Sequence, residues 1–542
     1  MINLKPFQRY LLSISTGLLI SLAWTELNLG LVLLIALIPL LFVEEFFYQH
    51  KENYSSVRVF NHAYIAIITW NIASTWWIYY ASFFGAVGAV VINSFLYSFV
   101  FWQFHVTKRK LGYSAGYISL MVYWCAFEYL HYNWEFEWPW LILGHGFSHN
   151  IKLVQWYEFT GTLGGSLWAI LINILIFRTF LYYKENQSKF NKKVILWIVT
   201  ISCFIGIPIS YSVYRYYSYQ EIENPVNIVV TQPNIDPYNG KFNSRNVTDQ
   251  LNIMLNLANS VGDSNTDFFV APETVIPYDI EEENINETEE IQYIRPFLKK
   301  FSNSEFVLGS STTKDYRAGE KIPSSARKYF KSDIYYDSYN SALLLDTTDD
   351  VQIYHKSRLV TGVEKIPYTE YLSFLNSLAV DLGGSTGTLG TQKDRTPFAS
   401  KKKNLKIAPV ICYESLFGEF VSEYVKNGAN LIFVITNDGW WGDTPGYKHH
   451  LTYSCLRAIE TRRSIARSAN TGISCFINQR GDILQATKWW EKAVIKGQLN
   501  ANNKITFYVE FGDYIGRISA FITVLLLLYR LAFNFKKKIS KS

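Results

Sequence analysis

The sequence predicts a membrane α-helical bundle of about eight transmembrane helices that carries an extracytoplasmic α/β domain. Two observations lead to this fold class. Aromatic residues make up 17% of the 542 residues and charged residues only 18%, and the apolar side chains crowd into residues 1–215 and the last stretch of the chain. Between them, residues from about 220 to 510 alternate short β-branched runs with helical stretches. The first pattern is typical of membrane spans and the second of an α/β fold.

Apolar runs define the expected helical bundle, because crossing a bilayer of roughly 30 Å takes about 20 residues. The first run follows Lys5 and Arg9, as in a signal peptide, but a second span follows almost at once, so we expect an uncleaved helix. The runs predict three domains: a seven-helix bundle at 1–220, an α/β domain at 221–510, and a last helix with a basic tail at 511–542. The expected spans are 10–25, 29–47, 61–80, 82–104, 114–130, 160–182, 194–214 and 516–535.

Basic residues in the loops predict the orientation, because short cytoplasmic loops retain Lys and Arg. Basic clusters lie at the start of the chain, at Lys108–Lys110, between residues 184 and 193, and at Lys536–Lys538, and these loops all fall on one side of eight spans. We therefore expect both termini in the cytoplasm and the α/β domain outside. The formal net charge of +6 comes largely from these clusters and needs no nucleic acid to explain it.

The long outer segment is predicted to be an α/β domain whose sheets are covered by helices, because its strands are nearly continuous in apolar residues. Two polar stretches, 281–290 and 314–337, are interpreted as solvated loops. The expected helices are 246–261, 289–301, 415–427 and 448–461, and the expected strands are 226–234, 267–277, 305–311, 341–346, 351–360, 406–414, 430–438, 463–470 and 472–484.

Three reactive side chains each stand at the end of one expected strand: Glu273, Lys356 and Cys412. Active sites of α/β proteins form at strand ends, where loops converge on a rigid sheet. A carboxylate, an ammonium and a thiol can carry out acyl transfer: a base activates the thiol, and a cation with a backbone N–H stabilises the oxyanion. Taken singly, each residue is more often a core, capping or surface residue.

No metal or cofactor is expected. The five cysteines show no CxxC spacing, which disfavours a zinc knuckle or a disulfide framework. His449, His450 and Cys455 lack zinc-ligand spacing, and the glycine-rich stretch at 161–166 lacks the lysine of a phosphate loop.

Longer motifs around the three residues closely resemble the nitrilase superfamily and, within it, the apolipoprotein N-acyltransferases of bacterial cell envelopes. The motifs are APETVIP, YHKSRLVTGVEKIPY, VICYES and the stretch that begins TNDGWWGD, all between residues 226 and 500. The resemblance implies a nitrilase-like αββα sandwich, and the family's catalytic triad maps onto Glu273, Lys356 and Cys412. It also implies supporting roles for Glu364, Tyr413 and Glu414. Weaker matches, interpreted as substrate or loop contacts, are Phe242, where family members commonly have Trp, and Trp140. Trp440 is an aromatic loop residue, and two interpretations stay open: it contacts lipid or gates the site, or it packs on a neighbouring strand.

One departure from the family pattern concerns the loop before Glu364. Family members usually have LVPFGE where this chain has LVTGVE, so the proline, which would fix φ near −65°, and the glycine directly before the Glu are absent or displaced. The spacing from Lys356 to Glu364 is nonetheless the family's.

The resemblance implies N-acylation of the α-amine of a diacylglyceryl-cysteine on bacterial apolipoproteins. The acyl chain would come from the sn-1 position of a phospholipid, through a thioester on Cys412. The implied partners are a phospholipid donor, a diacylated apolipoprotein acceptor and the lipid bilayer, with no nucleic acid and with a monomeric chain. The implied location is the bacterial cytoplasmic (inner) membrane, with the catalytic domain in the periplasm.

Two alternatives stay open. The first is a membrane-anchored amidase or nitrilase-like hydrolase, in which water resolves the thioester. The second is a non-enzymatic transport or scaffold protein, which predicts that Cys412→Ala leaves function intact. Charged residues within the spans are expected to be few apart from Glu128, and this disfavours an ion pathway.

Overall fold

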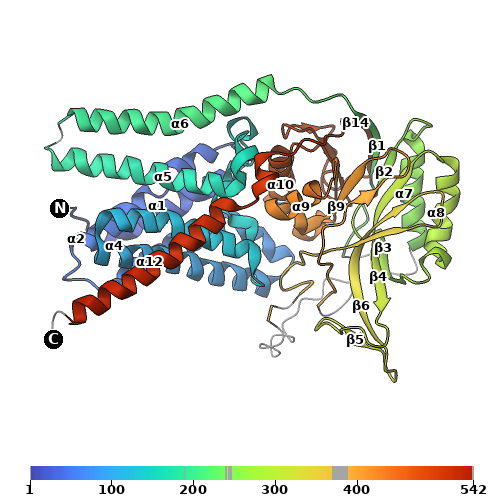
Figure 1. Ribbon diagram of the computed structural model, residues 1–542, viewed down its shortest axis with the longest axis horizontal. Coiled ribbons are helices and arrows are strands. Elements are labelled where there is room, and N and C mark those ends of the chain that lie inside the picture. The colour runs from blue at the N-terminus through green and yellow to red at the C-terminus, as the bar shows by residue number, and fades with distance from the viewer. Residues whose placement is uncertain are drawn as a thin grey trace. The chain divides into compact units, whose positions relative to one another are not determined.

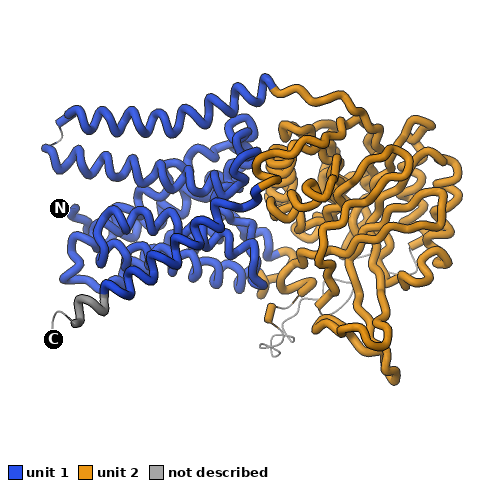
Figure 2. Tube along the Cα trace, viewed as in Figure 1, with its two compact units in different colours: residues 1–79, 86–218, 511–542 blue, residues 80–85, 219–510 orange. Residues whose placement is uncertain are grey.

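The computed structural model describes residues 2–187, 189–238, 241, 247–365, 367–368 and 388–539. These residues form two compact units (Figure 2). Unit 1 comprises residues 1–79, 86–218 and 511–542, and unit 2 comprises residues 80–85 and 219–510.

Unit 1 is helical. Gly112, at φ +84°, and Gly161, at φ +59°, interrupt the helices α4 and α5, because glycine tolerates positive φ values that other residues rarely adopt. The longer helices are α1 (Pro6–Ser21), α2 (Ile38–Gln49), α3 (Val57–Thr75), α4 (Phe83–Asn133), α5 (Tyr157–Glu185), α6 (Lys192–Ser218) and α12 (Tyr514–Ile539).

Among the described residues, five helical segments are long and apolar enough to cross a membrane, judged by length and composition. The expected spans 82–104 and 114–130 lie on the two sides of the break in α4. The expected spans 10–25 and 61–80 correspond largely to α1 and α3, which are not among the five. The five are Gly30–Gln49, Phe83–Asn133, Tyr157–Glu185, Lys192–Ser218 and Tyr514–Phe533.

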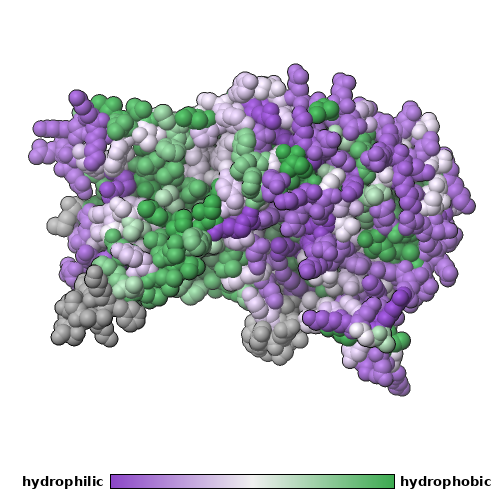
Figure 3. All heavy atoms as spheres, viewed as in Figure 1, coloured by the Kyte–Doolittle hydropathy of each residue, from purple (hydrophilic) through white to green (hydrophobic). Residues whose placement is uncertain are grey.

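The surface of unit 1 is apolar where these helices are exposed. Figure 3 shows hydrophobic residues over the helices of unit 1 and mostly hydrophilic residues over unit 2. Such a continuous apolar surface is expected where lipid, and not water, surrounds the helices. Exposed apolar side chains on α6 and α12 include Leu196, Val199, Ile207, Phe521, Val524 and Leu528.

A cluster of charged residues lies fully buried inside unit 1, which corrects the expectation that Glu128 is nearly alone in the spans. Lys108 Nζ lies 2.6 Å from Glu44 Oε2 and 2.7 Å from Glu45 Oε2. His105 Nδ1 lies 2.7 Å from Glu44 Oε1, and the Tyr113 hydroxyl donates to Glu45 Oε1 at 2.6 Å. Buried charges persist when they are paired in this way. The cluster therefore pairs its charges internally and holds α2 against α4.

Unit 2 contains two β-sheets. The first has the strand order β14-β1-β2-β4-β6-β5, with β3 paired to β4 and β7 paired to β6. Its strands are β1 (Pro225–Gln232), β2 (Phe268–Val270), β3 (Ile276–Glu281), β4 (Glu305–Asp315), β5 (Arg327–Lys328), β6 (Tyr335–Leu345), β7 (Gln352–His355) and β14 (Ala493–Asn500).

The second sheet has the strand order β13-β12-β11-β10-β9-β8. Strands β9, β10 and β11 run parallel and are buried apart from Lys406 at the start of β9, as expected of strands covered on both faces. The strands are β8 (Phe398–Ala399), β9 (Lys406–Ile411), β10 (Leu431–Thr436), β11 (Ile465–Ala469), β12 (Cys475–Ile477) and β13 (Ile483–Leu484).

The two sheets pack face to face with helices outside them (Figure 1). The ring of Phe268 on β2 lies 5.4 Å from that of Phe433 on β10, centroid to centroid. Helices α7 (Val247–Val261) and α8 (Glu289–Lys300) cover the first sheet, while α9 (Gly418–Lys426) and α10 (Pro445–Thr461) accompany the second. The expected α/β layering is therefore present.

Several sequence-based expectations differ in detail from this fold. Strand β14 was not expected, because its burial does not alternate clearly and its partner β1 lies more than 250 residues away. The polar stretch 314–337 is not entirely loop, since it contains β5 and the start of β6. The stretch 281–290 holds the end of β3 and the beginning of α8.

The core between the first sheet and its helices gives a prediction about stability. Phe269 is fully buried, and its ring packs on Phe297 and Phe301 at centroid distances of 4.8 and 5.0 Å. Replacing Phe269 with Ala should destabilise unit 2 by about 3–5 kcal/mol, through lost burial and the cavity left behind. The melting temperature of the detergent-solubilised protein should fall by roughly 10 °C.

The matched control is Phe330→Ala, because the side chain of Phe330 is 89% exposed. This variant should melt within about 1 °C of the parent protein. Equal melting temperatures for the two variants would show that the packing of Phe269 on Phe297 and Phe301 does not contribute to the stability of unit 2.

Candidate active site

Cys412 is the first residue after β9, and its backbone is unusual. Its φ is +50°, a left-handed conformation that non-glycine residues seldom adopt away from functional sites. The side chain is 9% exposed. Burial raises the pKa of the thiol, and the negative charge of Glu273 raises it further against the opposing effect of Lys356. The thiol is therefore protonated at neutral pH, and it needs a base to become a nucleophile.

Glu273 and Lys356 meet in a buried ion pair. Glu273 lies in the loop after β2, and Lys356 follows β7 directly. The Lys356 ammonium donates to Glu273 Oε1 at 3.1 Å. Burial would raise the pKa of Glu273, but Lys356 and Lys241 outweigh it and hold that pKa below its ordinary value. Glu273 is therefore ionised, as a general base must be.

Glu364 completes a bridge over the same lysine. Lys356 Nζ donates to Glu364 Oε1 at 2.8 Å, so one ammonium lies between two carboxylates. Burial lowers the pKa of Lys356, but Glu273 and Glu364 outweigh it and raise that pKa above its usual range. Lys356 is therefore a permanent cation beside the thiol.

Asn340 on β6 was not identified from the sequence, yet it contacts both carboxylates. Its side-chain amide donates to Glu273 Oε1 at 2.8 Å and to Glu364 Oε1 at 3.0 Å. Its backbone carbonyl accepts from the N–H of Lys356 at 2.8 Å. Asn340 lies within a strand and in no recognised motif, and only its place opposite the end of β7 reveals its role.

The loop that departs from the family pattern still delivers Glu364 to Lys356. The Val360 N–H donates to Glu364 Oε2 at 2.8 Å, and the Glu364 N–H donates to the Val360 carbonyl at 2.9 Å. Gly362 has φ +85°, which lets the chain turn between them. A glycine turn thus carries the chain through this loop, where the family usually has a proline.

Lys241 is a second buried cation that sequence reasoning missed. Its ammonium donates to the backbone carbonyl of Glu273 at 2.9 Å, and its side chain is buried. Burial lowers the pKa of Lys241 to about 8, against the opposing effects of Glu273 and Cys412. The only sequence signal was a lysine shortly after the first strand.

Tyr413 and Glu414 support the nucleophile loop. Glu414 Oε1 accepts from the Tyr354 hydroxyl and the Ser357 N–H, both at 2.7 Å, and its Oε2 accepts from the Ile411 N–H at 2.8 Å. Glu414 therefore ties the exit of β9 to the exit of β7. The Tyr413 ring is buried and packs edge-on against the ring of Phe417 at a centroid distance of 5.2 Å.

Three expected contact residues have different outcomes. Trp440 is half-buried, and its ring lies 5.3 Å from that of Tyr238, whose hydroxyl donates to the Trp440 carbonyl at 2.8 Å. Trp140 is buried and belongs to unit 1. Phe242 lies outside the described residues.

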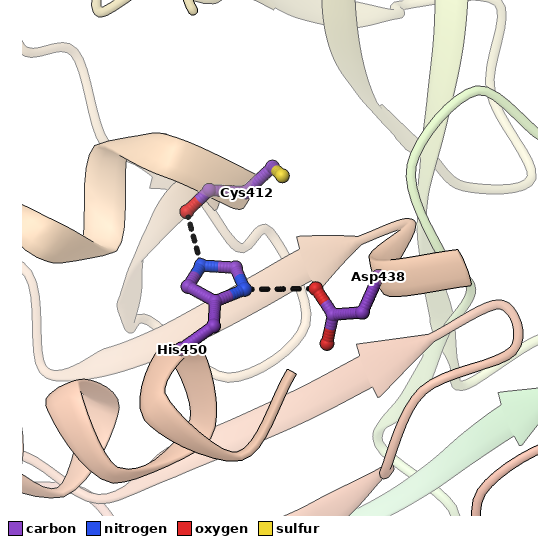
Figure 4. Close-up of side chains that lie close together, drawn as sticks. All are labelled: Cys412, Asp438 and His450. Carbon is purple, nitrogen blue, oxygen red and sulfur yellow. Dashed lines mark hydrogen bonds and ion pairs between the residues drawn. The ribbon is translucent and has the colours of Figure 1, made fainter. Parts of the chain in front are cut away.

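A buried group of Asp438, His450 and Arg467 lies behind Cys412. The Cys412, Asp438 and His450 side chains are close enough to be considered as metal ligands (Figure 4). However, His450 directs Nε2 to the Cys412 carbonyl at 3.0 Å and Nδ1 to Asp438 Oδ1 at 2.8 Å. Arg467 Nη2 lies 2.6 Å from Asp438 Oδ2, where its positive charge opposes a metal cation. The group is therefore better suited to hydrogen bonding than to metal binding.

Comparisons with known proteins identify both parts of the chain. Residues 16–175 match the model of the apolipoprotein N-acyltransferase N-terminal domain. Residues 230–503, half of the chain, match the model of the carbon-nitrogen hydrolase family. The helices of unit 1 up to residue 175 and nearly all of unit 2 thus each match a known domain.

Relatives match along nearly the whole chain. An apolipoprotein N-acyltransferase of Chlorobaculum tepidum is 28% identical over 539 residues, covering 97% of this chain and 96% of the relative. One of Thermotoga maritima is 24% identical over 531 residues, covering 95% of this chain and 92% of the relative. This chain is accordingly a membrane protein with several apolar helices. It belongs to the carbon-nitrogen hydrolase family, in the branch that carries the apolipoprotein N-acyltransferase N-terminal domain.

Proposed function

We propose that the chain N-acylates the α-amine of a diacylglyceryl-cysteine on bacterial apolipoproteins, with a phospholipid sn-1 acyl chain as donor. The observation that carries the proposal is the buried ammonium of Lys356 between two carboxylates, acting electrostatically on the thiol of Cys412. The similarity to apolipoprotein N-acyltransferases over nearly the full chain supports this choice of substrates.

The first half-reaction forms a thioester on the enzyme. Glu273 takes the proton of the Cys412 thiol, directly or through Lys356, and the sulfur attacks the sn-1 ester carbonyl. The Lys356 ammonium stabilises the oxyanion of the tetrahedral intermediate. When the intermediate collapses, the C–O bond breaks, the proton held by Glu273 passes to the leaving alkoxide, and a lysophospholipid departs.

The second half-reaction transfers the acyl chain. The α-amine of the lipoprotein's diacylglyceryl-cysteine attacks the thioester carbonyl, and Glu273 accepts a proton from the attacking nitrogen. An amide bond forms, the C–S bond breaks, and the proton returns to the sulfur of Cys412. Each step uses the same base and the same cation, so a ping-pong cycle needs no further reactant.

The membrane explains why both substrates are lipids. We infer that unit 2 lies outside the cytoplasmic membrane and that both termini lie in the cytoplasm, in a monomeric chain. The basic residues at the start of the chain, between residues 184 and 193, and at Lys536–Lys538 support this orientation. The exposed apolar side chains of α6 and α12 support contact with lipid.

Intact-mass analysis tests the first half-reaction. After exposure to phosphatidylethanolamine in mixed micelles, the protein should gain the mass of one fatty acyl group, labile to hydroxylamine. Cys412→Ala should lose this adduct, because it removes the attacking sulfur. The matched control is Cys203→Ser, because Cys203 is an exposed cysteine in unit 1 and should leave the adduct unchanged.

The acceptor distinguishes this reaction from the alternatives. A diacylated lipopeptide should clear the adduct and appear as the N-acylated product. Steady release of free fatty acid without the lipopeptide would instead indicate a hydrolase. An undiminished adduct on Cys412→Ala would show that Cys412 is not the nucleophile. If Cys412→Ala still supported lipoprotein maturation, the protein would not be an acyltransferase that acts through this cysteine.

Lys241 gives a prediction about pH dependence. Acylation requires ionised Glu273, so its rate should fall as the pH drops through the pKa of Glu273. Lys241 helps to hold that pKa low, and Lys241→Met should therefore raise it. The acid limb of the rate of Cys412 acylation should move to higher pH by roughly one unit.

The control for this experiment is Lys402→Met, since Lys402 is exposed on the surface of unit 2. Its pH profile should coincide with that of the parent protein. If Lys241→Met lowers the rate equally at every pH, Lys241 does not act through the charge of Glu273.

A further inference from the structure

The backbone carbonyl of Cys412 is held by two side-chain donors. His450 Nε2 lies 3.0 Å from this oxygen (Figure 4). The Ser415 hydroxyl donates to the same oxygen at 2.8 Å. Both donors are fully buried. The carbonyl belongs to the residue at φ +50°, so these bonds act on the strained point of the nucleophile loop.

His450 is itself fixed in one orientation. A carbonyl oxygen carries no hydrogen, so Nε2 is the donor to Cys412. Nδ1 lies 2.8 Å from Asp438 Oδ1. Although burial would raise the pKa of Asp438, Arg467 and His450 hold it far below its usual range, so Asp438 is an ionised acceptor. Arg467 Nη2 lies 3.1 Å from the same Nδ1 and 2.6 Å from Asp438 Oδ2, so Asp438 and Arg467 together fix the orientation of the His450 ring.

The direction of this carbonyl determines the direction of the next backbone N–H. The described peptide bonds are trans, and across a trans peptide the C=O and the following N–H point in opposite directions. With the Cys412 carbonyl turned toward His450, the Tyr413 N–H lies in the same peptide plane and points away from His450. Electron withdrawal by two donors at the carbonyl also polarises this N–H.

We propose that His450 is a positioning residue that, together with Ser415, aims the backbone N–H of Tyr413 at the oxyanion formed on the acylated carbon. Asp438 and Arg467 hold the His450 ring in the orientation that this requires. The proposal rests on the proposed function, because it concerns the oxyanion of the same acyl transfer. The Tyr413 N–H and the Lys356 ammonium would then stabilise one oxygen from two sides. No atom of His450 exchanges a proton with substrate.

Two reactions of the Cys412 sulfur distinguish an effect of His450 on the oxyanion from an effect on the thiol itself. Attack on an ester passes through an oxyanion, whereas displacement of iodide from iodoacetamide by the thiolate does not. Loss of an aimed oxyanion donor should therefore slow acylation by phosphatidylethanolamine and spare alkylation. Both rates are read on the Cys412 peptide by mass spectrometry, in the Cys203→Ser background, so that the exposed thiol does not interfere.

We expect His450→Ala to lower the rate of acylation by about 100-fold, while alkylation changes less than about threefold. His450→Gln, whose amide can still donate to the carbonyl, should recover part of the lost rate. Ser415→Ala removes the second donor to the carbonyl, together with the contact between Ser415 Oγ and His450 Nε2 at 2.9 Å, and should lower acylation by about 10-fold, again with alkylation spared. Ser415→Ala also covers the case in which a His450 variant does not fold, as judged by its melting temperature.

The outcomes are distinct. Equal losses of acylation and alkylation in Ser415→Ala and the folded His450 variants would overturn the proposal, because the residues would then act on the thiol. Unchanged acylation in these variants would overturn it as well. A parent protein that is never acylated would refute the proposed function instead, whatever the variants do.

Discussion

The site depends on one interaction, the buried bridge of Lys356 between Glu273 and Glu364. Three charged groups are withdrawn from water at one point, and each is tolerated because an opposite charge lies 2.8–3.1 Å away. The bridge links three segments that are separated in the sequence: the loop after β2, the end of β7 and the 360–365 loop. Its chemical effect follows from the same pairing, because Glu273 stays ionised and Lys356 stays charged beside a protonated thiol.

The two sheets of unit 2 divide the chemistry between them. The first sheet supplies the base and the cation, and the second supplies the nucleophile with the network behind its carbonyl. Their alignment therefore depends on the apolar packing between the sheets, where Phe268 meets Phe433. This division explains why burial serves the reaction: a dry interface strengthens every charge interaction at the point where the sheets meet.

The sequence predicted most of unit 2, because its strands are short β-branched runs with reactive residues directly at their ends. Glu273, Lys356 and Cys412 lie at or shortly after strand ends, and the family motifs around them single them out. Asn340 and His450 could not be found in this way, since one lies inside a strand and the other inside a helix, and their roles arise only from long-range packing. The helices of unit 1 were harder for a related reason. Length and hydropathy mark apolar runs, but they do not show that Glu44, Glu45 and Lys108 pair inside the bundle.

The loop before Glu364 shows which feature of the motif is physically constrained. Proline would limit φ to about −65° in this loop, yet here Gly362 turns the chain at φ +85°, and Glu364 still reaches Lys356 at 2.8 Å. The spacing of eight residues from Lys356 to Glu364 is the family's, and in this chain the carboxylate is held from two sides, by the Lys356 ammonium and by the Val360 N–H. The backbone between them can vary as long as it returns the carboxylate to the ammonium. The constraint on this region is therefore the contact between the Glu364 carboxylate and the charged Lys356, and not the exact path of the loop.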